Sequence, residues 1–166
     1  MRQGVPRRAV VLAIGAVALM AAVGVLILTS GRPEQPDAGS ISLDPSDVVL
    51  VADGQRIYAE FCASCHGQAL EGQPDWQRRS ADGRLPAPPH DPSGHTWHHP
   101  DHVLFLLTKY GTAAMMNDPD YQSDMPGFEQ VISDRDIVAV LSYIKSTWPA
   151  EIRARHDAIN ARAAGG

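Results

Sequence analysis

The stretch CASCHG, residues 62–67, contains both cysteines of the chain and a histidine directly after the second one. Cys62 and Cys65 are three positions apart, so on a helical turn their thiols point in the same direction. A disulfide between them would close a very small loop and add little stability, because the entropic gain of a disulfide grows with loop length. We therefore expect the two sulfurs and His66 to serve another purpose together.

The pattern C-x-x-C-H is the attachment signature for c-type haem. Each thiol can form a thioether with one vinyl group of the porphyrin, and the histidine is then held below the ring with its imidazole aimed at the iron. The covalent links keep this ligand beside the haem, so the iron–nitrogen bond costs little further ordering entropy. We predict one covalent haem c, with Cys62 and Cys65 as the attachment sites and His66 as an axial iron ligand.

Two other uses of a C-x-x-C pair agree less well with the rest of the chain. A thioredoxin-like dithiol belongs to a βαβ context, and the sequence shows no strand pattern. Half of a zinc site would need two more soft ligands, and no second cysteine pair exists.

A run of twenty uncharged residues, 9–28, follows a short basic N-terminus. At about 1.5 Å per residue it matches a hydrocarbon core roughly 30 Å thick. It is longer than the apolar region of a cleaved signal peptide, and the following TSGRPEQ offers no good cleavage site. We expect a cytoplasmic N-terminus over residues 1–8 and a transmembrane anchor, or uncleaved signal, over 9–29. By the positive-inside rule, the chain crosses the inner (cytoplasmic) membrane once and the remainder is exported to the periplasm or its equivalent.

The exported part is acidic. Three of the 14 basic residues and none of the 19 acidic residues precede residue 31, which leaves a net charge of −8 beyond that point. This balance disfavours nucleic acid and suits a basic protein partner. Residues 30–47 are rich in Pro, Gly, Ser and Asp without apolar periodicity, so we predict a flexible linker. Such a linker keeps the domain near the membrane at high effective concentration. We therefore expect membrane respiratory complexes or exported oxidoreductases as redox partners, and no small-molecule substrate.

Residues 48–148 read as one all-α domain of three helices and two long irregular stretches. One helix leads into the cysteines, the second lies between Pro100 and Gly111, and the third opens at SDRD, an N-cap followed by acids. Residues 149–166 form a polar tail that can add a final surface helix. Long loops and few large apolar residues are unusual in a domain of this size. A large apolar cofactor in the middle accounts for both.

With these features the chain resembles the small mono-haem class I c-type cytochromes over about residues 53–148. GQRIYAEFCASCHG looks like the first helix of that family running into the haem site, APPH resembles its proline loop, and SDMPGF resembles its distal ligand loop. The resemblance implies the cytochrome c fold and an electron-transfer protein rather than an enzyme. It also implies that the Pro88 carbonyl accepts a hydrogen bond from His66 Nδ1. The first and last helices are expected to cross where a glycine admits an aromatic ring, for which Gly54 and Tyr143 are the candidates.

The sixth iron ligand decides the function. Met115 and Met116 follow the second helix and can simply pack against the core or the haem. Met125 lies before a proline just ahead of the last helix, as the family's distal ligand does, and a thioether there raises the redox potential relative to a second histidine. With His66 and Met125 both bound, the iron is an electron relay. With a labile sixth ligand, the alternative is a haem sensor or a peroxidase-like enzyme.

Five of the seven histidines lie in HDPSGHTWHHPDH. One of them could replace methionine on the iron, and they could also serve solvation or hydrogen-bond haem propionates. His95, His98, His99 and His102 have a spacing that suits a second metal such as copper, which leaves open a copper-handling protein as a further alternative. Pro100 argues against a continuous helix that would align the four.

Overall fold

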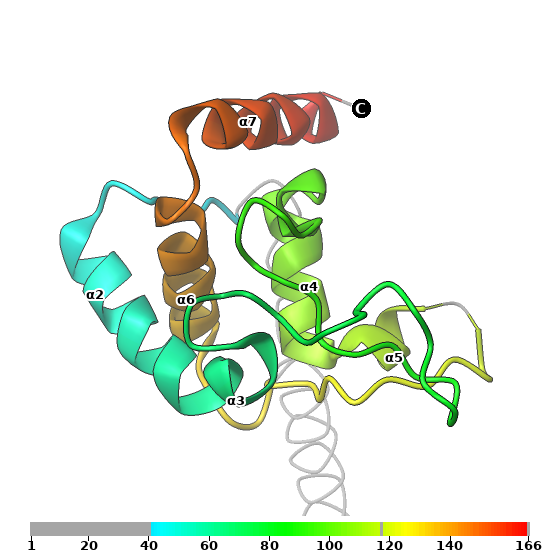
Figure 1. Ribbon diagram of the computed structural model, residues 1–166. Coiled ribbons are helices and arrows are strands. Elements are labelled where there is room, and N and C mark those ends of the chain that lie inside the picture. The colour runs from blue at the N-terminus through cyan, green and yellow to red at the C-terminus, as the bar shows by residue number, and fades with distance from the viewer. Residues whose placement is uncertain (1–40, 117, 166) are drawn as a thin grey trace, which may run out of the picture. The chain divides into compact units, whose positions relative to one another are not determined.

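The computed structural model describes residues 41–116 and 118–165, and every regular element within these ranges is helical. The elements are α2 (Val48–Ile57), a π-helical turn (Tyr58–Cys62), α3 (Ala63–His66), a 3-10 turn (Thr96–His98), α4 (Asp101–Tyr110), α5 (Thr112–Met115), α6 (Asp134–Ser146) and α7 (Ala150–Ala164). In Figure 1, α2, α6 and α4 form a layer, and α7 lies across one end of it. The predicted all-α domain is confirmed for this part of the chain.

None of the helices that the structure describes is long and apolar enough to cross a bilayer. The anchor predicted over residues 9–29 lies outside the described residues. The end of the predicted linker, residues 41–47, is described, and it packs onto the domain. Leu43 is buried, and its N–H donates to Asp101 Oδ2 at 2.9 Å.

Side-chain caps fix where α2 and α6 begin. Asp47 accepts hydrogen bonds from the N–H groups of Val49 and Leu50 at the start of α2. At the start of α6, Ser133 and Asp136 form a reciprocal capping box, as the SDRD pattern predicts. Each cap satisfies backbone donors that the first helical turn leaves without partners.

The crossing of α2 and α6 depends on Gly54. A Cβ atom at this position would lie 2.0 Å from the Ala139 carbonyl oxygen and 2.9 Å from Tyr143 Cβ. The ring of Tyr143 then packs beside that of Tyr58, with centroids 5.6 Å apart. The predicted glycine–tyrosine pair therefore lies where the two helices approach most closely.

The apolar core is small and is formed mainly by α6 and the helices beside it. Its fully buried large residues include Trp148, Tyr58, Phe105, Ile137 and Val140. The π-helical turn between α2 and α3 differs from the uninterrupted helix that the sequence predicts. Such turns are rare and are found frequently at functional sites, and this one directly precedes the C-x-x-C-H motif.

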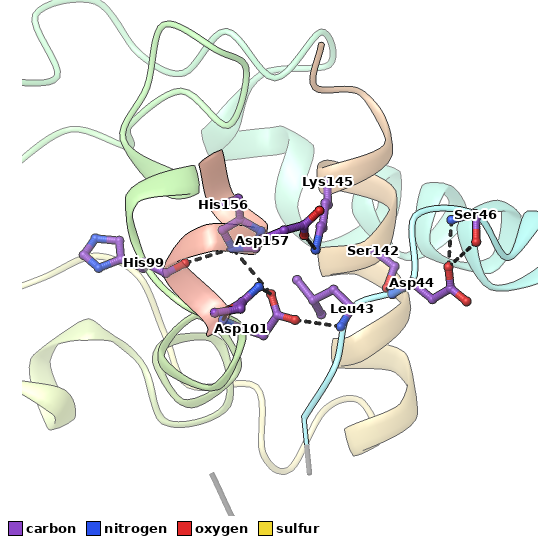
Figure 2. Close-up of polar contacts among 10 residues, drawn as sticks. Leu43, Asp44, Ser46, His99, Asp101, Ser142, Lys145, His156 and Asp157 are labelled. Atoms are coloured by element: carbon purple, nitrogen blue, oxygen red, sulfur yellow. Dashed lines mark hydrogen bonds and ion pairs between the residues drawn. The ribbon is translucent and has the colours of Figure 1, made fainter. Parts of the chain in front are cut away.

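Helix α7 docks mainly through polar groups, which Figure 2 shows. His156 is its one fully buried residue, and Nε2 lies 3.0 Å from the His99 carbonyl oxygen and 3.4 Å from Asp101 Oδ1. Asn160 accepts from the N–H of Asp101 at 2.7 Å and donates to its carboxylate at 2.9 Å. The buried Lys145 of α6 pairs with Asp157 at 2.7 Å. The polar tail is thus a helix held by hydrogen bonds and one ion pair.

Candidate functional site

The π-helical turn and α3 place the two cysteines and the histidine of the motif on consecutive turns. Cys62 is half-buried and Cys65 is exposed, and both are free thiols. Burial, and then the neighbouring Cys65, raises the pKa of the Cys62 thiol to about 11. A redox dithiol needs the opposite, a thiol with a lowered pKa. The described part of the chain also lacks the strands of a thioredoxin-like unit, so the dithiol alternative is not supported.

His66 is buried, with 7% of its surface exposed. Its Nδ1 lies 2.8 Å from the Pro88 carbonyl oxygen, the contact that the resemblance implies. A carbonyl oxygen only accepts, so Nδ1 carries the proton and Nε2 carries the lone pair. Burial lowers the pKa of His66, and the bond to Pro88 partly opposes this shift. The imidazole is thus neutral at physiological pH and is prepared to bind a metal through Nε2.

Two hydrogen-bonded segments hold the Pro88 carbonyl in place. The N–H groups of His90 and Asp91 donate to the Leu70 carbonyl at 2.8 and 3.2 Å. The N–H of Gly72 donates to the His66 carbonyl at 2.8 Å, and a Cβ on Gly72 would lie 2.4 Å from the nitrogen of Pro89. The segment after the motif and the proline loop are therefore in direct contact.

Tyr58 is a further residue of the site that the sequence analysis did not identify as such. Its hydroxyl donates to the Gly67 carbonyl at 2.8 Å, directly after the motif, and burial raises the pKa of this phenol. Tyr58 thus joins the helix crossing to the end of α3. The sequence carries no separate signal for this role, because a tyrosine four residues before Cys62 is equally typical of the apolar face of a helix.

Met125 is half-buried, whereas Met115 and Met116 are 37% and 43% exposed. The loop that carries it lies against the end of α4, because a Cβ on Gly111 would lie 3.1 Å from the Met125 carbonyl oxygen. Three residues further, Phe128 packs edge-on against Phe61, with centroids 6.5 Å apart. Phe61 directly precedes Cys62, so the loop with Met125 contacts the segment that leads into the motif.

Of the four histidines of the predicted second metal site, three precede Pro100 and His102 lies after it in α4; the ring centroids of His95 and His99 lie 5.5 Å apart. His95 stacks on Trp76 at 5.3 Å, and His98 lies edge-on to Trp97 at 3.7 Å. Within residues 41–116 and 118–165, no group of three or more His, Cys, Asp or Glu side chains is arranged to hold a metal ion. The structure therefore does not assemble the predicted cluster. Pro100, between the 3-10 turn and α4, interrupts the helix that would align it.

The residues around the motif fit a covalent haem. Two free thiols and a neutral, buried imidazole form the donor set, and four further iron ligands would come from the porphyrin rather than from side chains. Arg84 also has an unused donor. Its Nη1 pairs with Asp124 of the methionine loop at 2.8 Å, while its Nε is buried without a hydrogen-bond partner. Buried donors are rarely left unpaired, and an acidic group of a cofactor, such as a haem propionate, would satisfy this one.

Comparison with known proteins agrees with this chemistry. The sequence model of the cytochrome c family matches residues 51–148. The chain is also similar to the cbb3-type cytochrome c oxidase subunit CcoP of Rhodobacter capsulatus, with 32% identity over 108 residues. The aligned region is 64% of this chain and 32% of that subunit, so the chain spans about a third of the length of this relative. No solved structure matches the chain.

Proposed function

We propose that this chain, which belongs to the cytochrome c family, is a membrane-tethered one-electron carrier with His66 and Met125 as axial iron ligands. Family membership implies covalently bound haem c and an electron-transfer protein, and Cys62 and Cys65 have the required spacing. The observation that carries the proposed ligation is the His66 ring. Its Nδ1 is held on the Pro88 carbonyl at 2.8 Å, which leaves Nε2 for the iron.

Four residues of the site would bind the haem, in different roles. When bound, haem c supplies the Fe(II)/Fe(III) couple for one-electron transfer. Cys62 and Cys65 would hold the porphyrin covalently, while His66, shielded from water by its burial, would bind the iron through Nε2. Met125 would supply a thioether as the second protein ligand, which would favour the ferrous state and raise the potential relative to a second histidine. With both ligands fixed by the protein, one-electron transfer would need little reorganisation of the site.

Three observations support Met125 over the other methionines. It is less exposed than Met115 and Met116. Its loop contacts the segment before Cys62 through the Phe61–Phe128 pair, with centroids 6.5 Å apart. Its N–H also donates to Ser123 Oγ at 3.1 Å, which orders the backbone just before the thioether.

Absorbance spectroscopy on a matched pair of variants tests the ligation. Met125→Ala should keep its covalent haem and lose the weak absorbance band that reports sulfur bound to ferric iron. Met115→Ala, the control, should keep both. Persistence of the band in Met125→Ala would reject Met125 as a ligand. If the wild-type protein itself lacks the band at neutral pH and binds carbon monoxide readily, the haem sensor or peroxidase-like alternative replaces the electron carrier.

The tether and the partners are also part of the proposal. Residues 9–28 are uncharged and follow three arginines, which supports a single-pass anchor in the inner membrane with the haem domain exported. The similarity to a subunit of a cbb3-type cytochrome c oxidase supports a membrane respiratory complex as partner. Membrane fractionation and N-terminal sequencing of the mature protein test this directly. A haem domain recovered from the soluble fraction with a new N-terminus beyond residue 30 would reject the anchor.

A further inference from the structure

The rings of His66 and His90 stack on each other. Their centroids are 4.0 Å apart and their planes meet at 24°. The same loop therefore contacts His66 twice, through the Pro88 carbonyl at Nδ1 and through the flat face of His90. The hydrogen bond selects the tautomer, but it holds only one edge of the ring. A second ring stacked on its face opposes rotation of the imidazole about its Cβ–Cγ bond.

His90 is itself held firmly enough to serve this purpose. Its Nδ1 lies 2.8 Å from Thr96 Oγ1, and the Thr96 hydroxyl can donate onward to the Pro89 carbonyl at 3.4 Å. Its carbonyl accepts from Trp148 Nε1 at 2.7 Å, and Trp148 is almost fully buried. The side chain of His90 is thus held by Thr96 of the 3-10 turn. Its backbone is held by Trp148, which follows α6.

We propose that His90 is a positioning residue for His66, whose ring sets the plane of the His66 imidazole and thereby the direction in which Nε2 meets the haem iron. This inference rests on the proposed role of His66 as an axial ligand. It is independent of the sixth ligand, because Met125 binds the opposite face. His90 was singled out from the sequence only as one member of a histidine-rich stretch, and the stacking gives it a separate function.

The test compares two replacements of the same residue with a control. His90→Phe keeps a flat ring beside His66, whereas His90→Leu keeps apolar volume without one. His98→Leu removes a histidine of the same stretch that packs against Trp97 instead. The measurement is the NMR spectrum of the four haem methyl groups in the ferric protein, because their spread depends on the orientation of the axial imidazole plane. Covalent haem content is measured in parallel.

We expect His90→Leu to shift the haem methyl resonances or to add a second set, with haem content unchanged. His90→Phe and His98→Leu should retain the wild-type order and spread. A wild-type pattern in His90→Leu would overturn the proposal, as would an equal change in His90→Phe. Loss of haem from both His90 variants would also overturn it, because His90 would then be needed for folding or maturation. Failure of the Met125 assignment shows separately, as loss of the bound methionine methyl signal in the ferrous wild-type protein.

Discussion

Two buried histidines, His66 and His156, are held in similar ways and serve different ends. Each places one ring nitrogen near a backbone carbonyl, His66 Nδ1 at 2.8 Å from Pro88 and His156 Nε2 at 3.0 Å from His99. In His66 the other nitrogen, Nε2, is the proposed iron ligand. In His156 the other nitrogen, Nδ1, is buried with no hydrogen-bond partner. The same contact thus prepares a ligand in one region and fastens a helix in the other, and only the neighbouring groups distinguish the two.

The largest expected effect is on haem content, which should depend on the His66 region and not on the His156 region. Replacing Cys62 and Cys65 by serine removes both attachment points, and covalent haem should fall to background in mass spectrometry and in the pyridine haemochrome spectrum. The small apolar core should then fail to hold a stable fold. His156→Leu, by contrast, should retain full haem content. A stable, folded and haem-free double variant would contradict the central place of the cofactor.

The second effect concerns the helix crossing that supports the His66 region. Gly54→Ala puts a methyl group where the Ala139 carbonyl oxygen would be only 2.0 Å away, so the helices must separate. We expect a loss of about 3 kcal/mol in the free energy of unfolding, measured by denaturant titration. Gly165→Ala, at the end of α7, meets its nearest atom at 3.6 Å and should change stability by less than about 0.5 kcal/mol. Equal effects of the two substitutions would mean that the crossing is not tightly packed.

The third effect is confined to the region of His156. Asn160→Ala removes both hydrogen bonds with Asp101. The backbone N–H and the carboxylate of Asp101 then each lose a partner. We expect a loss of about 1–3 kcal/mol and faster amide hydrogen exchange in α7, with the haem spectrum unchanged. Arg155→Ala, at an exposed position of the same helix, is the control. A haem spectrum altered by Asn160→Ala would show that the two regions are coupled more strongly than the comparison suggests.

The smallest effect is on pH dependence. Burial, and then the charge of Lys145, lowers the pKa of His156, although Asp101 opposes this shift. The unfolded chain therefore binds a proton at higher pH than the folded chain does. Stability should fall as the pH drops below about 6.5, by at most about 1.4 kcal/mol per pH unit for this group. His156→Gln replaces the ring N–H by an amide N–H donor and removes the titratable ring. The free energy of unfolding of this variant should therefore depend less steeply on pH between pH 7.5 and 5.5. An unchanged slope would assign the dependence to titratable groups other than His156.

Much of the haem region was predictable from the sequence, because several of its features are specified by residues that are close together in the chain. The C-x-x-C-H motif and the cap at Ser133 are each visible within a few residues, whereas the glycine of the helix crossing was predicted only from the family resemblance. The contact between His66 and Pro88 spans 22 positions, and it was predicted only because the proline loop resembles that of a known family. The π-helical turn at Tyr58–Cys62 was missed, because the apolar spacing before the motif is equally compatible with a continuous α-helix.

The region of His156 was not predictable in the same way. Helix α7 has a mostly exposed surface and no apolar stripe, so its sequence indicated only a polar tail that can add a surface helix, with no sign of how it docks. Its docking depends on pairs such as Asp101–Asn160, whose members are 59 positions apart. The four histidines proposed for a second metal are not brought together in the described part of the chain, for a related reason. The spacing of its four histidines would suit a helix, but Pro100 ends one element and starts another.

The sequence by itself determined where haem attaches and which nitrogen-bearing side chain follows the attachment site, because covalent chemistry needs particular residues at fixed short spacing. It also determined where α6 begins, through a capping box that involves only Ser133 and Asp136. The tertiary structure alone decided which carbonyl His156 meets, which ring lies against His66, and how a polar helix is held on the domain. Hydrogen bonds and ring stacking depend on distances of a few ångströms between segments far apart in the chain, and only folding brings those segments together.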